Sequence, residues 1–129
     1  MDEDLTTAAI KVQRAWKAAF ETRDLTRLSA LYTDQTAFYG STAEFYTTPE
    51  GVRTYFELLP ASFTRSDYAV PHIVRLGPDA MAATGEVTFY TEENGIVTPR
   101  PFRMTHVLVR SGGRWKIATH HASPRPDRR

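Results

Sequence analysis

The hydrophobic period of this chain changes once, near Ser62, and that change limits the folds open to it. Before Ser62, apolar residues recur every three or four positions, as in helices that bury one face. After Ser62, apolar and polar residues alternate, as in strands that face a core on one side. Helices gathered early and strands gathered late predict an α+β domain with an antiparallel sheet.

Apolar spacing and capping residues predict three helices and one short strand before Ser62. The first helix covers residues 5–20 and carries Trp16 on its apolar face. An aspartate caps the second helix, which covers residues 24–34 and precedes a short strand at 36–39. The third helix covers residues 48–60, because a threonine followed by proline opens it and another proline closes it.

Turn residues divide the second part of the chain into strands. We expect one strand over residues 68–76, either bent at Pro71 or at an edge of the sheet, because proline has no backbone donor for the sheet. The next strand covers residues 80–91 and leads into an Asn-Gly hairpin turn at 94–95. The last two strands are separated by the glycines at 112–113.

Length, charge and composition exclude several classes of protein. The chain has 129 residues, the size of one domain, which we place at 1–123 with a flexible basic tail at 124–129. Its net charge of +1 gives no attraction to nucleic acid or to anionic membranes. Without cysteine it has no disulfide and no thiolate metal site. The N-terminus lacks an export signal and no apolar run reaches the length of a membrane span, so we expect a cytoplasmic protein.

Candidate catalytic residues come from the last strands. His106 lies between apolar residues on one face of its strand, so it either lines a cavity or is a buried structural histidine. Glu86 is either a general base or a solvent-facing partner of Arg103 or another cross-strand basic residue. His120 and its neighbour His121 point to opposite faces if the strand alternates regularly. One of them then faces inward and the two cannot chelate a metal as a simple pair, so we expect no metal site.

Candidate ligand-binding residues are aromatic or basic. Trp16, Tyr39 and Tyr46 either line the mouth of a cavity or belong to the core. The small residues at 40–43 form a loop of the kind that gates a pocket. Arg103 is either a ligand for a carboxylate or enolate oxygen or an exposed residue beside the sheet.

Several of these features occur together in one known family. They are Trp16 in a helix, the step Arg23-Asp24-Leu25, the pair Leu31-Tyr32 before a strand, and the closing pattern R-x-T-x-V-L-x-R-x-G-G-x-W-K-I-x-x-H-H from Arg103 to His121. Together they resemble the SnoaL-like and SgcJ/EcaC-type branch of the nuclear transport factor 2-like superfamily, over about residues 10–124. The resemblance implies a curved antiparallel sheet wrapped around the N-terminal helices as a cone, cystatin-like in shape.

The same resemblance implies a hydrophobic pocket for a small apolar or aromatic ligand. The chain is then a cofactor-independent isomerase, cyclase (polyketide cyclase-like) or dehydratase, which transfers protons on an apolar, oxygenated substrate with His106 or His120 together with Glu86. Alternatively, it is a non-catalytic binding or accessory protein, or an assembly module with an incidental cavity. A lowered pKa of His106 without a carboxylate partner favours binding, whereas a raised pKa coupled to Glu86 favours catalysis.

A bare sheet face also predicts an assembly. The residues Val107, Val109, Trp115 and Ile117 are too many to fit inside so small a cone. We therefore expect a homodimer through the sheet that buries roughly 1,600 Å².

Overall fold

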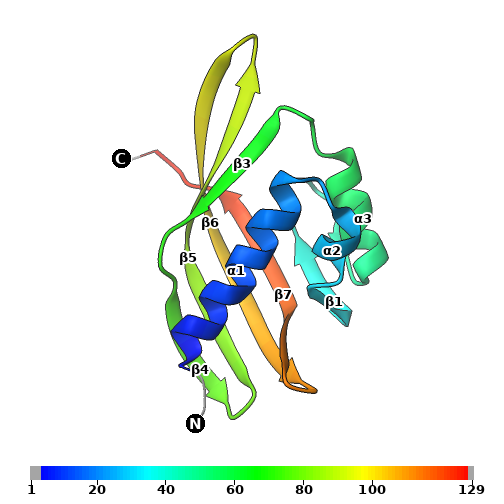
Figure 1. Cartoon of the computed structure of the whole chain (residues 1–129), viewed down its shortest axis with the longest axis vertical. Helices are drawn as coiled ribbons and strands as arrows, with labels where there is room; N and C mark the ends of the chain where they lie inside the picture. Colours follow the sequence, from blue (N-terminus) through cyan, green and yellow to red (C-terminus); the bar gives the residue numbers. More distant parts are fainter. Residues whose placement is uncertain (1–3, 128–129) are drawn as a thin grey trace.

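The computed structural model describes residues 4–127, in which three helices pack against a seven-stranded sheet (Figure 1). Along the chain the elements are α1 (Leu5–Glu21), α2 (Leu25–Ser29), β1 (Tyr32–Tyr39), β2 (Phe45–Tyr46), α3 (Pro49–Leu58), β3 (Phe63–Tyr68), β4 (His72–Gly77), β5 (Ala80–Glu93), β6 (Ile96–Ser111) and β7 (Arg114–Pro124). The α+β fold and the early helices are as the sequence predicts. The sheet order is β2-β1-β7-β6-β5-β3, with β4 also paired to β5.

The helix ends form where the capping residues predict. The side chain of Asp24 accepts a hydrogen bond from the backbone N–H of Arg27, which opens α2. The hydroxyl of Thr48 does the same for Gly51, with Pro49 in the first turn of α3. α2 is shorter than predicted, because the chain turns at residues 30–31 and enters β1 at once.

The sheet is antiparallel except where β1 and β7 pair in parallel. No hairpin joins these two strands, so turn geometry does not fix their relative direction. The long hairpin of β5 and β6 turns at Asn94 and Gly95, whose φ angles of 52° and 78° suit a primed turn. In Figure 1 the tip of this hairpin projects beyond the rest of the sheet.

The predicted single strand over residues 68–76 is wrong. The structure has two strands here, β3 and β4, and both pair with β5. The break contains Pro71, which lies between them and cannot donate to the ladder. The proline therefore interrupts the strand rather than bending it, and the two strands on either side of it both lie at the edge of the sheet, as expected.

A β-bulge in β7 changes which of its side chains point inward. Val107 on β6 pairs with Thr119, but the next residue, Leu108, pairs with Ile117. One residue of β7, Ala118, is therefore left over, and regular alternation is interrupted. With regular alternation, Ile117 and His120 would lie on opposite faces of the sheet, whereas both are buried inside.

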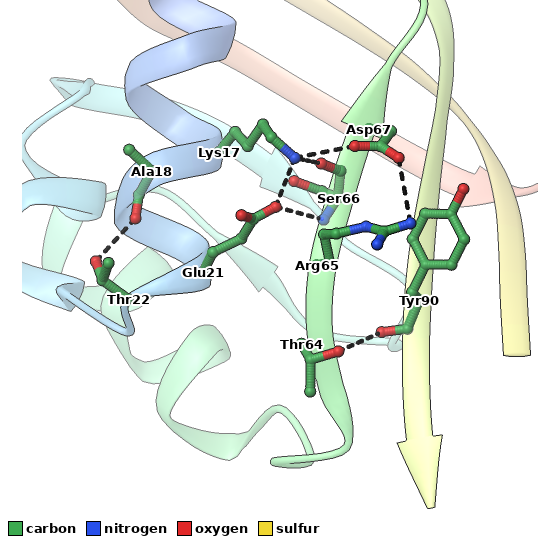
Figure 2. Close-up of polar contacts among 9 residues, drawn as sticks. All are labelled: Lys17, Ala18, Glu21, Thr22, Thr64, Arg65, Ser66, Asp67 and Tyr90. Carbon is green, nitrogen blue, oxygen red and sulfur yellow. Dashed lines mark hydrogen bonds and ion pairs between the residues drawn. The ribbon is translucent and has the colours of Figure 1, made fainter. Parts of the chain in front are cut away.

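An ionic cluster holds α1 across the sheet (Figure 2). The ammonium group of Lys17 donates to Glu21 at 2.7 Å, to Asp67 at 3.0 Å and to the backbone carbonyl of Ser66. The Glu21 carboxylate also accepts the backbone N–H of Ser66 at 3.0 Å. These contacts join α1 to β3 and so fix the helix that carries Trp16 over the concave face. Within residues 4–127, no helix is long and apolar enough to cross a membrane.

Candidate ligand-binding site

An aromatic cavity lies between the helices and the concave face of the sheet. Its volume is about 30 Å³, which is room for roughly two water molecules. It is lined by Trp16, Phe20, Gly40, Ser41, Tyr55, Phe56, Leu59, Phe63, Phe89, Phe102, Met104, His120 and Ala122. Typical ligand pockets measure roughly 300 Å³ or more, so side chains nearly fill this one.

His120 is the one imidazole among the residues lining this cavity. The bulge in β7 turns it inward, and its side chain is 3% exposed. Its ring stacks on Phe38 with the ring centres 4.2 Å apart. His121, the next residue, is exposed and tilts against Tyr39 on the outside. The expectation that one of the two histidines faces inward therefore holds, and the inward one is His120.

A chain of four buried polar side chains orients His120. The indole N–H of Trp16 donates to the hydroxyl of Tyr32 at 3.0 Å. That hydroxyl lies 3.0 Å from Nδ1 of His120, and Nε2 of His106 lies 2.8 Å from the same Nδ1. All four residues are at most 3% exposed. Because buried polar groups need partners, this network fixes the position of the His120 ring.

Burial keeps both histidines neutral. It lowers the pKa of His106 to about 3. Burial also lowers the pKa of His120 well below its usual value, and the neighbouring His106 and His121 add to that effect. Near neutral pH each imidazole therefore carries one N–H and one bare nitrogen. Such rings can donate and accept hydrogen bonds but carry no charge.

We expect the protein to lose stability as the pH falls below about 6.5, the usual pKa of histidine in an unfolded chain. In that range His106 and His120 become protonated in the unfolded chain but stay neutral in the folded protein. Each histidine then removes up to about 1.4 kcal/mol of unfolding free energy per pH unit, and the loss due to His106 ends near pH 3. Urea unfolding at pH 7, 6 and 5 measures this slope. His106→Gln should flatten it, and an unchanged slope in that variant would contradict the assignment.

Among the described residues, the Glu86 carboxylate is not hydrogen-bonded to either histidine, although Glu86 and His106 both line a small pocket of about 10 Å³. By strand alternation Glu86 shares the outer face with Arg103, opposite to Met104 and His106. Its carboxylate pairs with Arg125 at 2.6 Å instead of with Arg103, its neighbour in register. Arg103 is exposed on that same outer face, away from the cavity. Within residues 4–127, no group of three histidine, aspartate and glutamate side chains is arranged to hold a metal ion.

The aromatic candidates divide between the inside and the surface. Trp16 is 1% exposed and lines the cavity. Tyr46 is half-buried and does not line the cavity, but it packs edge-on against Tyr55, which does. Tyr39 is 44% exposed and pairs with Phe45 on the surface, outside the cavity.

Sequence reasoning missed Tyr32 and Tyr55 as parts of the site. From the sequence, Tyr32 is noted only as a residue that precedes a strand, whereas it opens β1 and its hydroxyl lies 3.0 Å from Nδ1 of His120. The hydroxyl of Tyr55 accepts the backbone N–H of Ser41 at 3.0 Å and lies 3.0 Å from its side-chain hydroxyl. In both cases the sequence offered one indication: a tyrosine among apolar residues is buried with its hydroxyl, and a buried hydroxyl needs a hydrogen-bond partner.

The loop at residues 40–43 separates the cavity from a surface groove. Gly40 and Ser41 line the inner cavity and also an outer groove of about 350 Å³ that contains His121. The two hydrogen bonds of Tyr55 hold this loop in place. Displacing the loop would join the cavity to the groove.

Gly40→Ala is expected to cost about 1–3 kcal/mol of unfolding free energy, because the added methyl group would overlap the ring of Tyr55. Urea denaturation of the variant measures this cost. Gly77→Ala is the matched control, since nothing lies near its added methyl group. Equal stability of the two variants would show that residues 40–43 do not pack on Tyr55 as described.

Comparison with known proteins identifies the family. The model of the SnoaL-like domain matches residues 10–127, which is most of the chain. The chain belongs to the SnoaL-like family. No curated protein matches this SnoaL-like chain significantly.

Solved structures share the nuclear transport factor 2-like fold of this SnoaL-like chain. A provisionally named calcium/calmodulin-dependent protein kinase II association domain from Xanthomonas campestris is 23% identical, with a TM-score of 0.86 over 98% of this chain and 91% of that one. A ketosteroid isomerase-like protein from Erwinia carotovora atroseptica is 18% identical, with a TM-score of 0.80 over 98% and 100%. A protein from Catenulispora acidiphila in complex with S-DNPA is 16% identical, with a TM-score of 0.79 over 93% and 92%. At sequence identities this low, the similarity establishes the fold alone. Any activity has to be inferred from the residues of the site.

Proposed function

We propose that the protein binds a small, largely apolar molecule that carries an oxygen atom, inside its cone. The observation that carries this proposal is the aromatic cavity with His120 in its wall. Apolar walls with a few fixed polar groups are typical of small-molecule sites. Family membership and the ligand complex of the Catenulispora acidiphila protein also support it.

The ligand enters by displacing the loop at residues 40–43. The cavity of about 30 Å³ is too small for an aromatic ring, and the groove beyond Gly40 and Ser41 offers further space. Entry then costs only the two hydrogen bonds between Ser41 and Tyr55 and the packing of Gly40. Loops commonly make such gates in enzymes and binding proteins.

Binding without turnover fits the site better than acid–base catalysis. In the described residues, no carboxylate is hydrogen-bonded to His106 or His120, and burial lowers the pKa of both. A base with so low a pKa removes protons from carbon weakly at neutral pH. A neutral imidazole still makes a directed hydrogen bond to a ligand oxygen.

Proton-transfer chemistry is the second candidate, favoured by the 2.8 Å contact between His106 and His120. A proton accepted by one ring is shared with the other, which partly offsets the cost of burying the charge. Exchange of the acetophenone methyl hydrogens for deuterium in D2O tests this activity, because each exchange removes one proton and returns one deuteron. Exchange above the buffer rate that is lost in His120→Gln would establish catalysis.

Methyl NMR tests the binding proposal. With the methionine methyl groups labelled, acetophenone or p-cresol should shift the signal of Met104, which lines the cavity, in a saturable way. Met81 is the internal control, because it is fully buried and lies outside the cavity lining. Ala122→Phe should fill the cavity and abolish the shift. A Met104 signal that no aromatic compound moves would refute the proposal.

We also propose that the protein is a homodimer through the outer face of the sheet. Val74 and Leu76 are exposed on β4, and Val107 and Val109 are half-buried on β6. Ile117 belongs to the core and is not part of this face. Light scattering at high micromolar concentration should give twice the monomer mass, and Val107→Lys should reduce it to one. A monomeric parent protein would contradict the proposal.

A further inference from the structure

The hydrogen atoms of the buried network decide what His120 offers to a ligand. Nδ1 of His120 faces two groups, Nε2 of His106 at 2.8 Å and the Tyr32 hydroxyl at 3.0 Å. If Nδ1 is bare, the two groups share its single lone pair as donors, and the proton of the ring sits on Nε2. If Nδ1 carries the proton, it donates, and Nε2 is bare. The two forms present opposite hydrogen-bonding characters to the cavity.

The hydroxyl of Tyr32 distinguishes the two forms. Its oxygen already accepts the indole N–H of Trp16 at 3.0 Å. Within residues 4–127, the remaining partner of that hydroxyl is Nδ1 of His120. If Nδ1 carries the proton, the Tyr32 hydrogen has no acceptor in a residue that is 1% exposed. Leaving a buried donor unpaired is costly, so this form is disfavoured.

When Nδ1 of His120 is bare, every donor of the network has an acceptor. Trp16 donates to Tyr32, Tyr32 donates to Nδ1 of His120, and Nε2–H of His106 shares the same acceptor. His106 must carry its proton on Nε2 in this form, because two bare nitrogens 2.8 Å apart would repel each other.

The proton of the His120 ring then lies on Nε2, which no described residue contacts by a hydrogen bond. Among the described residues, Ser66 alone has a fully buried side-chain polar atom without a hydrogen-bond partner. Nε2 of His120 also lacks a partner, so it is not fully buried. His120 lines the aromatic cavity, so its Nε2–H is open to a bound molecule.

We propose that His120 presents an N–H donor to the cavity, so that the pocket selects apolar molecules with an acceptor oxygen, such as aromatic ketones. This inference rests on the proposed binding function. Tyr32 and His106 are positioning residues here: they touch no ligand and act by fixing the proton of His120.

Long-range ¹H–¹⁵N NMR of the histidine rings tests the proton positions without any ligand. Nitrogens with and without a proton resonate far apart, so the form is read directly. We expect a protonated Nε2 and a bare Nδ1 in both His106 and His120. Tyr32→Phe should introduce the Nδ1–H form of His120, whereas Tyr55→Phe, which removes a different hydroxyl at the cavity, should not. A parent protein with the proton on Nδ1 of His120 would overturn the proposal.

A matched pair of ligands tests the selectivity. Acetophenone and α-methylstyrene differ by a CH2 group in place of the carbonyl oxygen and are close in size, but only the ketone has an acceptor oxygen. His120→Phe should weaken acetophenone binding by roughly 3- to 10-fold relative to α-methylstyrene, the loss of one hydrogen bond. His121→Phe, its exposed neighbour, should not change the ratio.

Failure of the donor proposal and failure of the binding function give different results. If both ligands shift the Met104 methyl signal and His120→Phe leaves their ratio unchanged, the donor proposal fails and the binding function stands. If neither ligand shifts that signal, the binding function fails and the selectivity fails with it.

Discussion

Trp16→Ala is expected to cost about 3–5 kcal/mol of the free energy of unfolding. Trp16 is 1% exposed and packs against Phe20, Phe56, Tyr68 and Phe89, which come from α1, α3, β3 and β5. The substitution opens a cavity where the helices meet the sheet. It also removes the N–H group that bonds to Tyr32.

Urea denaturation monitored by far-ultraviolet circular dichroism measures this loss without relying on tryptophan emission. Trp115→Ala is the matched control, because Trp115 is only half-buried near the end of the sheet. We expect it to cost clearly less. A loss below about 1 kcal/mol for Trp16→Ala would contradict the central position given to α1.

His120→Ala is expected to cost about 2–4 kcal/mol, the second-largest effect. The variant loses the stacking on Phe38 and leaves two donors, on Tyr32 and His106, without their acceptor. His121→Ala, one residue further along, should change stability by about 0.5 kcal/mol or less, because that side chain is exposed. Chemical denaturation at pH 7 compares the pair. Equal effects of the two substitutions would mean that the bulge does not turn His120 inward.

The layout of the fold follows from local signals in the sequence. The apolar face of residues 5–20, the caps at Asp24 and Thr48 and the Asn-Gly turn act over a few neighbouring residues, and each appears where predicted. Such signals are short-range, so one sequence is enough to read them. Most departures from prediction are decided by pairing, as at the break at Pro71 and the parallel contact between β1 and β7. The early end of α2 goes with the early start of β1, which also pairs with β7.

The candidate site depends on long-range geometry, which the sequence only partly indicates. His106 among apolar residues pointed to the interior, where the structure has it. Whether His120 or His121 faces inward depends on a bulge, and a bulge is set by pairing with β6 rather than by β7 alone. Glu86 illustrates the same difficulty, because alternation placed it on a face but could not say that this face is the outer one. The partnership of Tyr32 with His120 joins residues 88 positions apart.

The most direct test of the binding function is a crystal structure of the protein grown with acetophenone. We expect the phenyl ring between Phe56, Phe89 and Met104, with the loop at residues 40–43 displaced. The ketone oxygen should lie within hydrogen-bond distance, roughly 3 Å, of Nε2 of His120. A cone without acetophenone and with residues 40–43 in their present position, or acetophenone bound only outside the cone, would contradict this binding function.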